Sequence, residues 1–145
     1  MKRTVKVKKL SDKAIIPTYG TQFSAGADLY ALDGEVIAAG ETKLIHTGIS
    51  LEIPEGLVGL IFARSGLATK RGLAPANKVG VIDSDYRGEI MVALYNQSGA
   101  EQKIDAGERV AQISFVPYYT AEFAQSEELD STARGEGGFG STGTK

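Results

Sequence analysis

The sequence predicts an all-β protein of the sandwich, jelly-roll or barrel kind, with one short helix. Short runs rich in β-branched or aromatic residues recur along the chain, and glycine or proline bounds most of them. Helical periodicity is nearly absent. With 145 residues, of which 42% are hydrophobic and 23% charged, the chain is expected to form one domain with a sizeable core.

The expected elements follow one another at short intervals. The first run, TVKVKKL at 4–10, alternates at its start, which is typical of a strand. A helix of one or two turns is expected over 65–72, SGLATKRG, with Ser65 as its N-cap. The other predicted strands, separated by turn residues, lie at 27–32, 35–40, 42–53, 56–63, 78–83, 89–96 and 109–119.

The composition changes near Thr120, where the chain becomes acidic and then glycine-rich, with little left to bury. We therefore expect a β-rich domain over 1–119 and a mobile C-terminal arm over 120–145. The arm ends in RGEGGFGSTGTK at 134–145, which nearly matches a phosphate-binding P-loop. The lysine and the serine or threonine that should close the motif are not in place. We also expect no helix behind the loop to aim its amides.

The charge and residue counts disfavour several function classes. A net charge of −2 argues against general nucleic-acid binding, which depends on many phosphate contacts. Without cysteine there is no disulfide or thiol nucleophile, and the zinc-deaminase motifs are missing. The longest apolar run, 56–63, is too short to span a membrane, and no apolar signal segment follows the basic start, so a cytoplasmic protein is expected. The single histidine, His46, lies in an extended run and is interpreted as a packed or surface residue.

Two stretches suggest a phosphate site. In FARSGLA, Arg64, Ser65 and Gly66 stand where a strand is expected to end and the helix to begin. Backbone amides at such a turn, with a hydroxyl and a guanidinium, can bind phosphate. A capping serine beside a solvated arginine explains the same residues equally well. In SAGADLYA, Asp28 lies between small and apolar neighbours.

Two further stretches place polar residues near expected strand ends. NKVGVIDSDYRGEIMVALYN predicts a hairpin, with a strand, an acidic turn and a second strand. Asp83 and Asp85 suit the turn for local reasons, because aspartate bonds nearby amides. That reason does not explain Tyr86, which offers a flat face to a sugar or base. In AGERVAQISF, Arg109 and Gln112 are each interpreted as rim residues.

Taken in order, five stretches resemble the motifs of the homotrimeric dUTPase family, the deoxyuridine triphosphate nucleotidohydrolases. The resemblance covers nearly the whole chain, and the third and fifth motifs are highly specific. Only minor positions depart from the common pattern, such as Ala63, where many members have proline. The five motifs are AGADLYA (25–31), ARSGLA (63–68), GVIDSDYRGE (80–89), GERVAQISFVP (107–117) and RGEGGFGSTG (134–143).

The resemblance implies a jelly-roll-like (β-clip) subunit that forms a homotrimer with three active sites between subunits. It also implies Mg²⁺-dependent hydrolysis of dUTP to dUMP and pyrophosphate, which lowers dUTP and supplies dUMP for thymidylate synthesis. By the family pattern, each site takes its first, second and fourth motifs from one subunit. The third motif comes from a second subunit and the arm from the third.

The resemblance also implies a role for each matching residue. Asp83 is the implied general base at the α-phosphorus, and Asp28 is implied to hold hydrated Mg²⁺ through water. Tyr86 is implied to pack under the deoxyribose and exclude a 2′-hydroxyl. The residues implied at the triphosphate are Arg64, Ser65, Gly66, Gln112, Arg134, Gly140 and Ser141, and those implied at the uracil are Asn77, Val81, Ile82, Met91 and, by stacking, Phe139.

Two alternatives stay open from the sequence. dCTP deaminase shares this fold and much of the motif order, but its amine chemistry needs a further carboxylate at the base. We interpret segment 83–96 as the dUTPase form, without such a glutamate in the strand after the turn, and ammonia release from dCTP discriminates the two. The other alternative is a non-catalytic nucleotide-binding jelly-roll module, which would not require Asp83, Arg64, Arg134 and Phe139 together.

Overall fold

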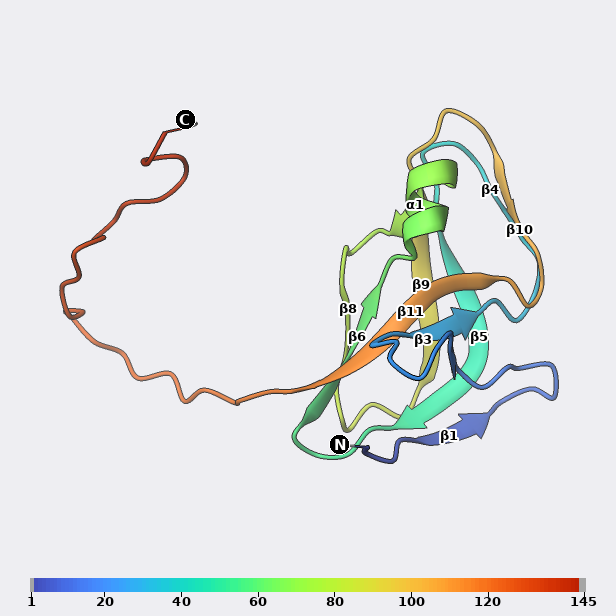
Figure 1. Cartoon of the computed structure of the whole chain (residues 1–145), viewed down its shortest axis with the longest axis horizontal. Helices are drawn as coiled ribbons and strands as arrows, with labels where there is room; N and C mark the ends of the chain where they lie inside the picture. Colours follow the sequence, from blue (N-terminus) through green and yellow to red (C-terminus); the bar gives the residue numbers. More distant parts are fainter. Residues whose placement is uncertain (1, 144–145) are drawn as a thin grey trace.

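The computed structural model describes residues 2–143, which form antiparallel sheets and one short helix (Figure 1). All strand pairs in this part of the chain are antiparallel. The predicted mostly-β class with one short helix is therefore confirmed. Met1, Thr144 and Lys145, at the ends of the two predicted segments, lie outside the described residues.

Within residues 2–143, eleven strands form three sheets. The four-stranded sheet has the order β1 (Lys6–Lys9), β5 (Thr42–Glu52), β9 (Glu89–Asn96) and β7 (Leu73–Pro75). The five-stranded sheet has the order β2 (Thr18–Tyr19), β3 (Ala27–Tyr30), β11 (Arg109–Pro117), β6 (Leu57–Phe62) and β8 (Gly80–Ile82). A two-stranded sheet pairs β10 (Gln102–Ile104) with β4 (Glu35–Ile37).

Each of the predicted strands overlaps a strand of the structure, but β2, β7 and β10 were not predicted. These three strands have only two or three residues each, too few for an alternating pattern to be recognised. Strands β2 and β7 pair with the longer strands β3 and β9, and β10 pairs with the equally short β4, so each depends on a partner strand elsewhere in the chain.

Helix α1 (Ser65–Arg71) lies where it was predicted and ends at Gly72. The left-handed backbone of Gly72, with φ 66°, returns its amide to the carbonyls of Leu67 and Ala68. The predicted N-cap was wrong. Arg64 has the extended backbone of an N-cap (φ −91°, ψ 130°), whereas Ser65 is already helical, and no side chain caps the helix.

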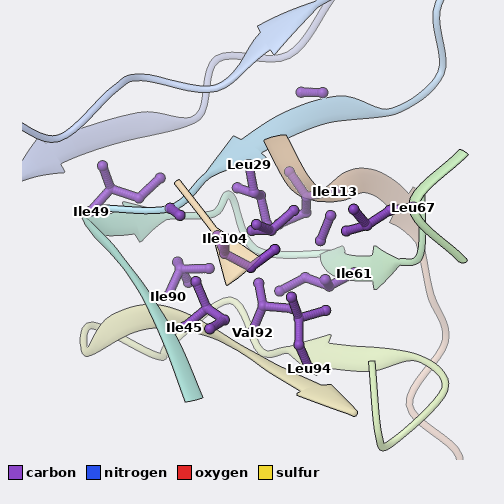
Figure 2. Packing of buried hydrophobic residues seen from close by; sticks show 14 of the residues in the cluster. Leu29, Ile45, Ile49, Ile61, Leu67, Ile90, Val92, Leu94, Ile104 and Ile113 are labelled. Carbon is purple, nitrogen blue, oxygen red and sulfur yellow. The ribbon is translucent and has the colours of Figure 1, made fainter. Parts of the chain in front are cut away.

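The core lies between the two larger sheets. Strand β9 alternates between buried and half-buried residues, with Ile90, Val92 and Leu94 on its buried face. Figure 2 shows these side chains gathered with Leu29 of β3 and Ile113 of β11, which come from the opposite sheet. The tight packing of this layer holds the two sheets, and the loops at their ends, in one arrangement.

The hairpin predicted over 77–96 was also wrong. Strand β8 pairs with β6, whereas β9 pairs with β5 on one side and with β7 on the other. Both edges of β9 are therefore occupied, which leaves no edge for β8. Residues 83–88 connect the five-stranded sheet to the four-stranded sheet instead of closing a turn within one sheet.

The segment that follows β11 differs from the rest of the molecule. Residues 120–143 contain no helix or strand, and almost all of them are exposed. Figure 1 shows this segment running away from the sheets. In the part of the chain that the structure describes, no helix has the length and apolar character needed to cross a membrane.

Candidate active site

A pocket of about 620 Å³ lies where three of the predicted motifs meet. It brings together the start of β3, the connection from β6 to α1, and the first half of β11. The residues that line it are Gly20, Ser24, Ala25, Gly26, Asp28, Arg64, Ser65, Gly66, Arg109 and Gln112. The first, second and fourth motifs are thus neighbours within one chain.

Strand register explains why these motifs meet. Strand β11 lies between β3 and β6, and Gln112 is opposite Asp28 on one side and Phe62 on the other. Asp28 and Gln112 alternate along their strands with buried core residues, so they point to the other face of the sheet. Strand β6 ends two residues before Arg64, which places the guanidinium beside Asp28.

Asp28 is the acidic residue that lines the pocket, and it pairs with two arginines. Its side chain is only 13% exposed, and its two oxygens face two arginines. Arg64 Nε donates to Oδ1 at 2.9 Å, and Arg109 Nη1 donates to Oδ2 at 3.4 Å. Two guanidinium charges against one carboxylate leave this group of side chains net positive. Both arginines keep further N–H donors free of Asp28, as a phosphate site requires.

Arg109 was interpreted from the sequence only as a rim residue, but it belongs to the pocket. Arg109 is three residues before Gln112 in β11. In a regular strand, two side chains that are an odd number of residues apart point to opposite faces. The register of β11 against β3 shifts between Arg109 and Ala111, as at a β-bulge. The extra residue brings Arg109 and Gln112 to the same face. The sequence has no recognisable signal for this bulge.

Gln112 is held in place by its neighbours. Its Nε2 donates to the carbonyl oxygen of Ala63 at 2.8 Å, which ties β11 to the residue before Arg64. Gly26 packs directly against the Gln112 side chain, where a Cβ at position 26 would overlap the amide oxygen. Gly26 was not among the predicted site residues, although its place in the SAGAD sequence was visible.

The residues of the third motif do not reach this pocket. Asp83 and Tyr86 lie in the connection between β8 and β9, and Tyr86 is 41% exposed. Val81 is 62% exposed on β8, and the half-buried Met91 lies opposite His46 of β5. Asn77 and Ile82, predicted near the uracil with them, also belong to this part of the chain and not to the pocket lining.

The strand after the turn was expected to lack a glutamate, and this expectation was wrong. Strand β9 does begin with a glutamate, Glu89. Its carboxylate is already engaged, because Oε2 lies 2.9 Å from His46 Nδ1 and Oε1 accepts the Gly48 amide at 2.9 Å. It therefore differs from the free carboxylate that deamination of a base would need.

The predicted arm residues form a third group, separate from the other two. Arg134 Nε donates to the carbonyl of Gly137 at 2.7 Å, and the Ser141 amide donates to Gly138 at 3.0 Å, so this stretch is a series of local turns. Gly140 has a left-handed backbone with φ 91°, and Phe139 is fully exposed. A large exposed aromatic ring beside glycine turns is suited to contact with another surface.

The pocket is compatible with a hydrated magnesium ion but not with a cage of protein ligands. Among residues 2–143 there is no group of three or more histidine, cysteine, aspartate or glutamate side chains that could hold a metal. Magnesium commonly binds through one or two carboxylates, substrate phosphates and several waters. A carboxylate has about four acceptor positions, so Asp28 can still accept bonds from water beside its two arginines.

Comparison with known proteins gives consistent matches. The dUTPase family model matches residues 12–143. The deoxyuridine 5′-triphosphate nucleotidohydrolase of Nautilia profundicola is 49% identical over 96% of this chain and 98% of that relative. The dUTPase of Staphylococcus bacteriophage 80alpha, solved with dUpNHpp, superposes with a TM-score of 0.92 at 32% identity over 99% of this chain and all of that one. A mutant dUTPase from phage phi11 of S. aureus, described with a structural Mg(II) ion, has a TM-score of 0.81 at 28% identity over 88% of this chain and 99% of that one.

Proposed function

This chain belongs to the dUTPase family and hydrolyses dUTP, and we propose that its pocket at Asp28 binds the triphosphate while further copies of the chain complete the site. The products are dUMP and pyrophosphate, so the enzyme lowers dUTP and supplies dUMP for thymidylate synthesis. One observation carries the proposal: the predicted site residues form three separate groups within a single chain, and only one group lines the pocket.

The pocket supplies most of the groups that a triphosphate requires. Arg64, Arg109 and Gln112 offer side-chain donors from two sides, and Ser65 and Gly66 lie at the start of α1. Charge-assisted bonds from guanidinium to phosphate are about twice as strong as neutral ones. Preorganised donors of this kind contribute most of the stabilisation in phosphoryl transfer.

Asp28 is the group proposed to hold magnesium, through water. The bound ion would neutralise charge on the phosphate oxygens and orient them for attack. Asp28 also aligns both arginines, since each of its oxygens is bonded to one of them. Its removal is therefore expected to weaken the binding of metal and to disorder the donors on the phosphates.

Asp83 is proposed as the general base that takes a proton from the water attacking the α-phosphorus. It lies outside the pocket of its own chain, on the connection between β8 and β9. Attack therefore needs Asp83 of a second copy, placed against the pocket of the first. A general base contributes roughly 10²- to 10⁴-fold, so the larger share of the acceleration comes from the donors in the pocket.

This connection and the strands that flank it, β8 and β9, are proposed to select the nucleoside. Backbone groups at Asn77, Val81, Ile82 and Met91 would bind the uracil edge, and backbone donors cannot adapt to the altered pattern of cytosine. Tyr86 would lie under the deoxyribose and exclude a 2′-hydroxyl. Rejection of the ribose would be strong, because the added hydroxyl would be buried without a partner.

The arm is proposed as a lid from a third copy, which makes the working unit a homotrimer. Ordering each residue costs roughly 1–2 kcal/mol of backbone entropy. Against this, Arg134 and the amides near Gly140 and Ser141 offer charge-assisted bonds of about 1.5–3 kcal/mol each. Stacking of Phe139 on the uracil adds about 1–3 kcal/mol. These opposing terms are similar in size, so the arm is expected to close only over bound triphosphate.

A substrate panel tests the activity directly. Each nucleoside triphosphate is incubated with Mg²⁺, and release of pyrophosphate and of ammonia is followed. We expect pyrophosphate from dUTP alone and no ammonia from dCTP. Ammonia release from dCTP, or the absence of turnover with every nucleotide, would contradict the assignment.

A further inference from the structure

Glu89, the first residue of β9, joins two strands through its side chain. Its Oε2 lies 2.9 Å from His46 Nδ1, and its Oε1 accepts the backbone amide of Gly48 at 2.9 Å. Both partners belong to β5, the neighbouring strand. The Glu89 side chain is 22% exposed and that of His46 is 52% exposed, so the pair lies at the protein surface.

The β5 partners lie in an irregular part of the strand. The register between β5 and β9 shifts between His46 and Ser50, and Gly48 within this interval has φ 69°. A Cβ at Gly48 would press against Leu32 and Ala14, so this bend of β5 is closely packed. Thr47 Oγ1 also donates to the carbonyl of Ile90. Glu89 and Ile90, the first two residues of β9, are therefore both bonded to this bend of β5.

The start of β9 in turn holds Tyr86. The Tyr86 hydroxyl donates to the main-chain carbonyl of Glu89 at 3.0 Å, and Gly88 packs under the tyrosine ring with no room for a Cβ. Tyr86 is otherwise substantially exposed. The position of its ring thus depends on where the Glu89 backbone lies, and the contacts of the Glu89 side chain with β5 help to hold that backbone beside its pairing with Ser50.

We propose that Glu89 and His46 are positioning residues for sugar selection, which fix the start of β9 and through it the ring of Tyr86. The proposal rests on the proposed exclusion of the 2′-hydroxyl by Tyr86. A hydrogen bond between two side chains at the protein surface contributes only modestly to global stability. Its effect is therefore expected in the discrimination between dUTP and UTP, because a small displacement of Tyr86 is enough to admit one oxygen atom.

The test measures kcat/KM for UTP relative to dUTP in Glu89→Ala, Glu89→Gln, Tyr86→Ala and the double variant Glu89→Ala/Tyr86→Ala. Glu89→Ala is expected to raise the ratio about tenfold, a coupling typical of residues in one hydrogen-bonded network. Glu89→Gln keeps an acceptor for Gly48 and should change the ratio much less. In the Tyr86→Ala background, Glu89→Ala should add less than about twofold, because the ring on which it acts is gone.

A matched control is Glu35→Ala. Glu35 lies in the two-stranded sheet and forms an ion pair at 2.8 Å with Lys43 of β5, so the change removes a similar carboxylate without touching Tyr86. The ratio should stay at the parent value in this control. If Glu89→Ala does not fold, His46→Ala replaces it, since it leaves the bond from Gly48 to Glu89 intact, and a rise of about threefold is expected.

The outcomes separate this inference from the function on which it rests. If Tyr86→Ala raises the ratio but the folded Glu89 and His46 variants leave it unchanged, the positioning role is wrong while the role of Tyr86 stands. If Glu89→Ala has its full effect in the absence of Tyr86, Glu89 acts by another route and the inference is overturned. If Tyr86→Ala itself changes nothing, both the inference and the proposed sugar selection fail.

Discussion

Gly26 offers a sharp test of the pocket, because its substitution by alanine acts on one neighbour. A Cβ at this position would overlap the amide oxygen of Gln112, with Cδ at 3.0 Å and Cβ at 3.2 Å. The backbone of Gly26 is not left-handed, so alanine is disfavoured by space and not by conformation. The Gln112 side chain must therefore move away from its 2.8 Å bond to Ala63.

The size of the effect follows from what Gln112 loses. Its withdrawal would remove the hydrogen bond that we propose it donates to a phosphate, and a hydrogen bond to a charged group is worth about 1.5–3 kcal/mol. At about 1.4 kcal/mol per factor of ten, kcat/KM for dUTP should fall about 10- to 150-fold. The broken bond and the crowding should also lower the free energy of unfolding by about 1–3 kcal/mol.

The assay is steady-state hydrolysis of dUTP, with thermal unfolding measured on the same preparations. Gly99→Ala is the control, since a Cβ there meets nothing and the backbone is not left-handed. In a Gln112→Ala background, Gly26→Ala should cost little more, because the overlapping amide is gone. A kcat/KM within about twofold of the parent, or a full loss that persists in the Gln112→Ala background, would refute the reasoning.

Three further predictions concern the other groups of the site. Asp83→Asn should lower turnover by at least about 10²-fold, whereas dUpNHpp should still bind. Single-turnover kinetics and binding measurements check these two results, and near-normal turnover would show that Asp83 is not the general base. Truncation after Ala133, which removes no strand, should lower kcat more than it raises KM. Arg134→Ala should reproduce much of the loss in kcat. Full turnover of the truncated protein would show that the arm has no part in catalysis. Asp28→Asn should raise the Mg²⁺ concentration needed for half-maximal activity and weaken Mg²⁺-dependent binding of dUpNHpp; an unchanged Mg²⁺ dependence would exclude Asp28 as the metal site.

The sequence predicted the mostly-β class and the first, second and fourth motifs of the pocket. Short bounded runs define strands locally, whereas Gln112 was assigned to the site only through the resemblance to the family motifs, because its local pattern marked it as a rim residue. Arg109 could not be assigned in the same way, because a β-bulge that depends on pairing with β3 decides which face it occupies.

The connection between β8 and β9 shows a second limit of sequence reasoning. Two strands separated by an aspartate-rich turn are typical of a hairpin, yet the pairing partners of β8 and β9 come from distant parts of the chain. Tertiary pairing therefore decided the sheet to which each strand belongs. The N-cap was misplaced for a smaller reason, because the backbone turns helical at Ser65 and not after it.

The central proposal is that one active site takes its pocket, its general base and its lid from different copies of the chain. The most direct test is co-expression of Asp83→Asn subunits with Arg134→Ala subunits, each of which should be strongly impaired alone. In randomly mixed trimers, about a quarter of the sites would receive both an intact Asp83 and an intact Arg134 from other copies. Recovery of dUTP hydrolysis toward that fraction is the predicted result. Activity no higher than that of the two variants alone, in trimers shown to be mixed, would contradict the shared site.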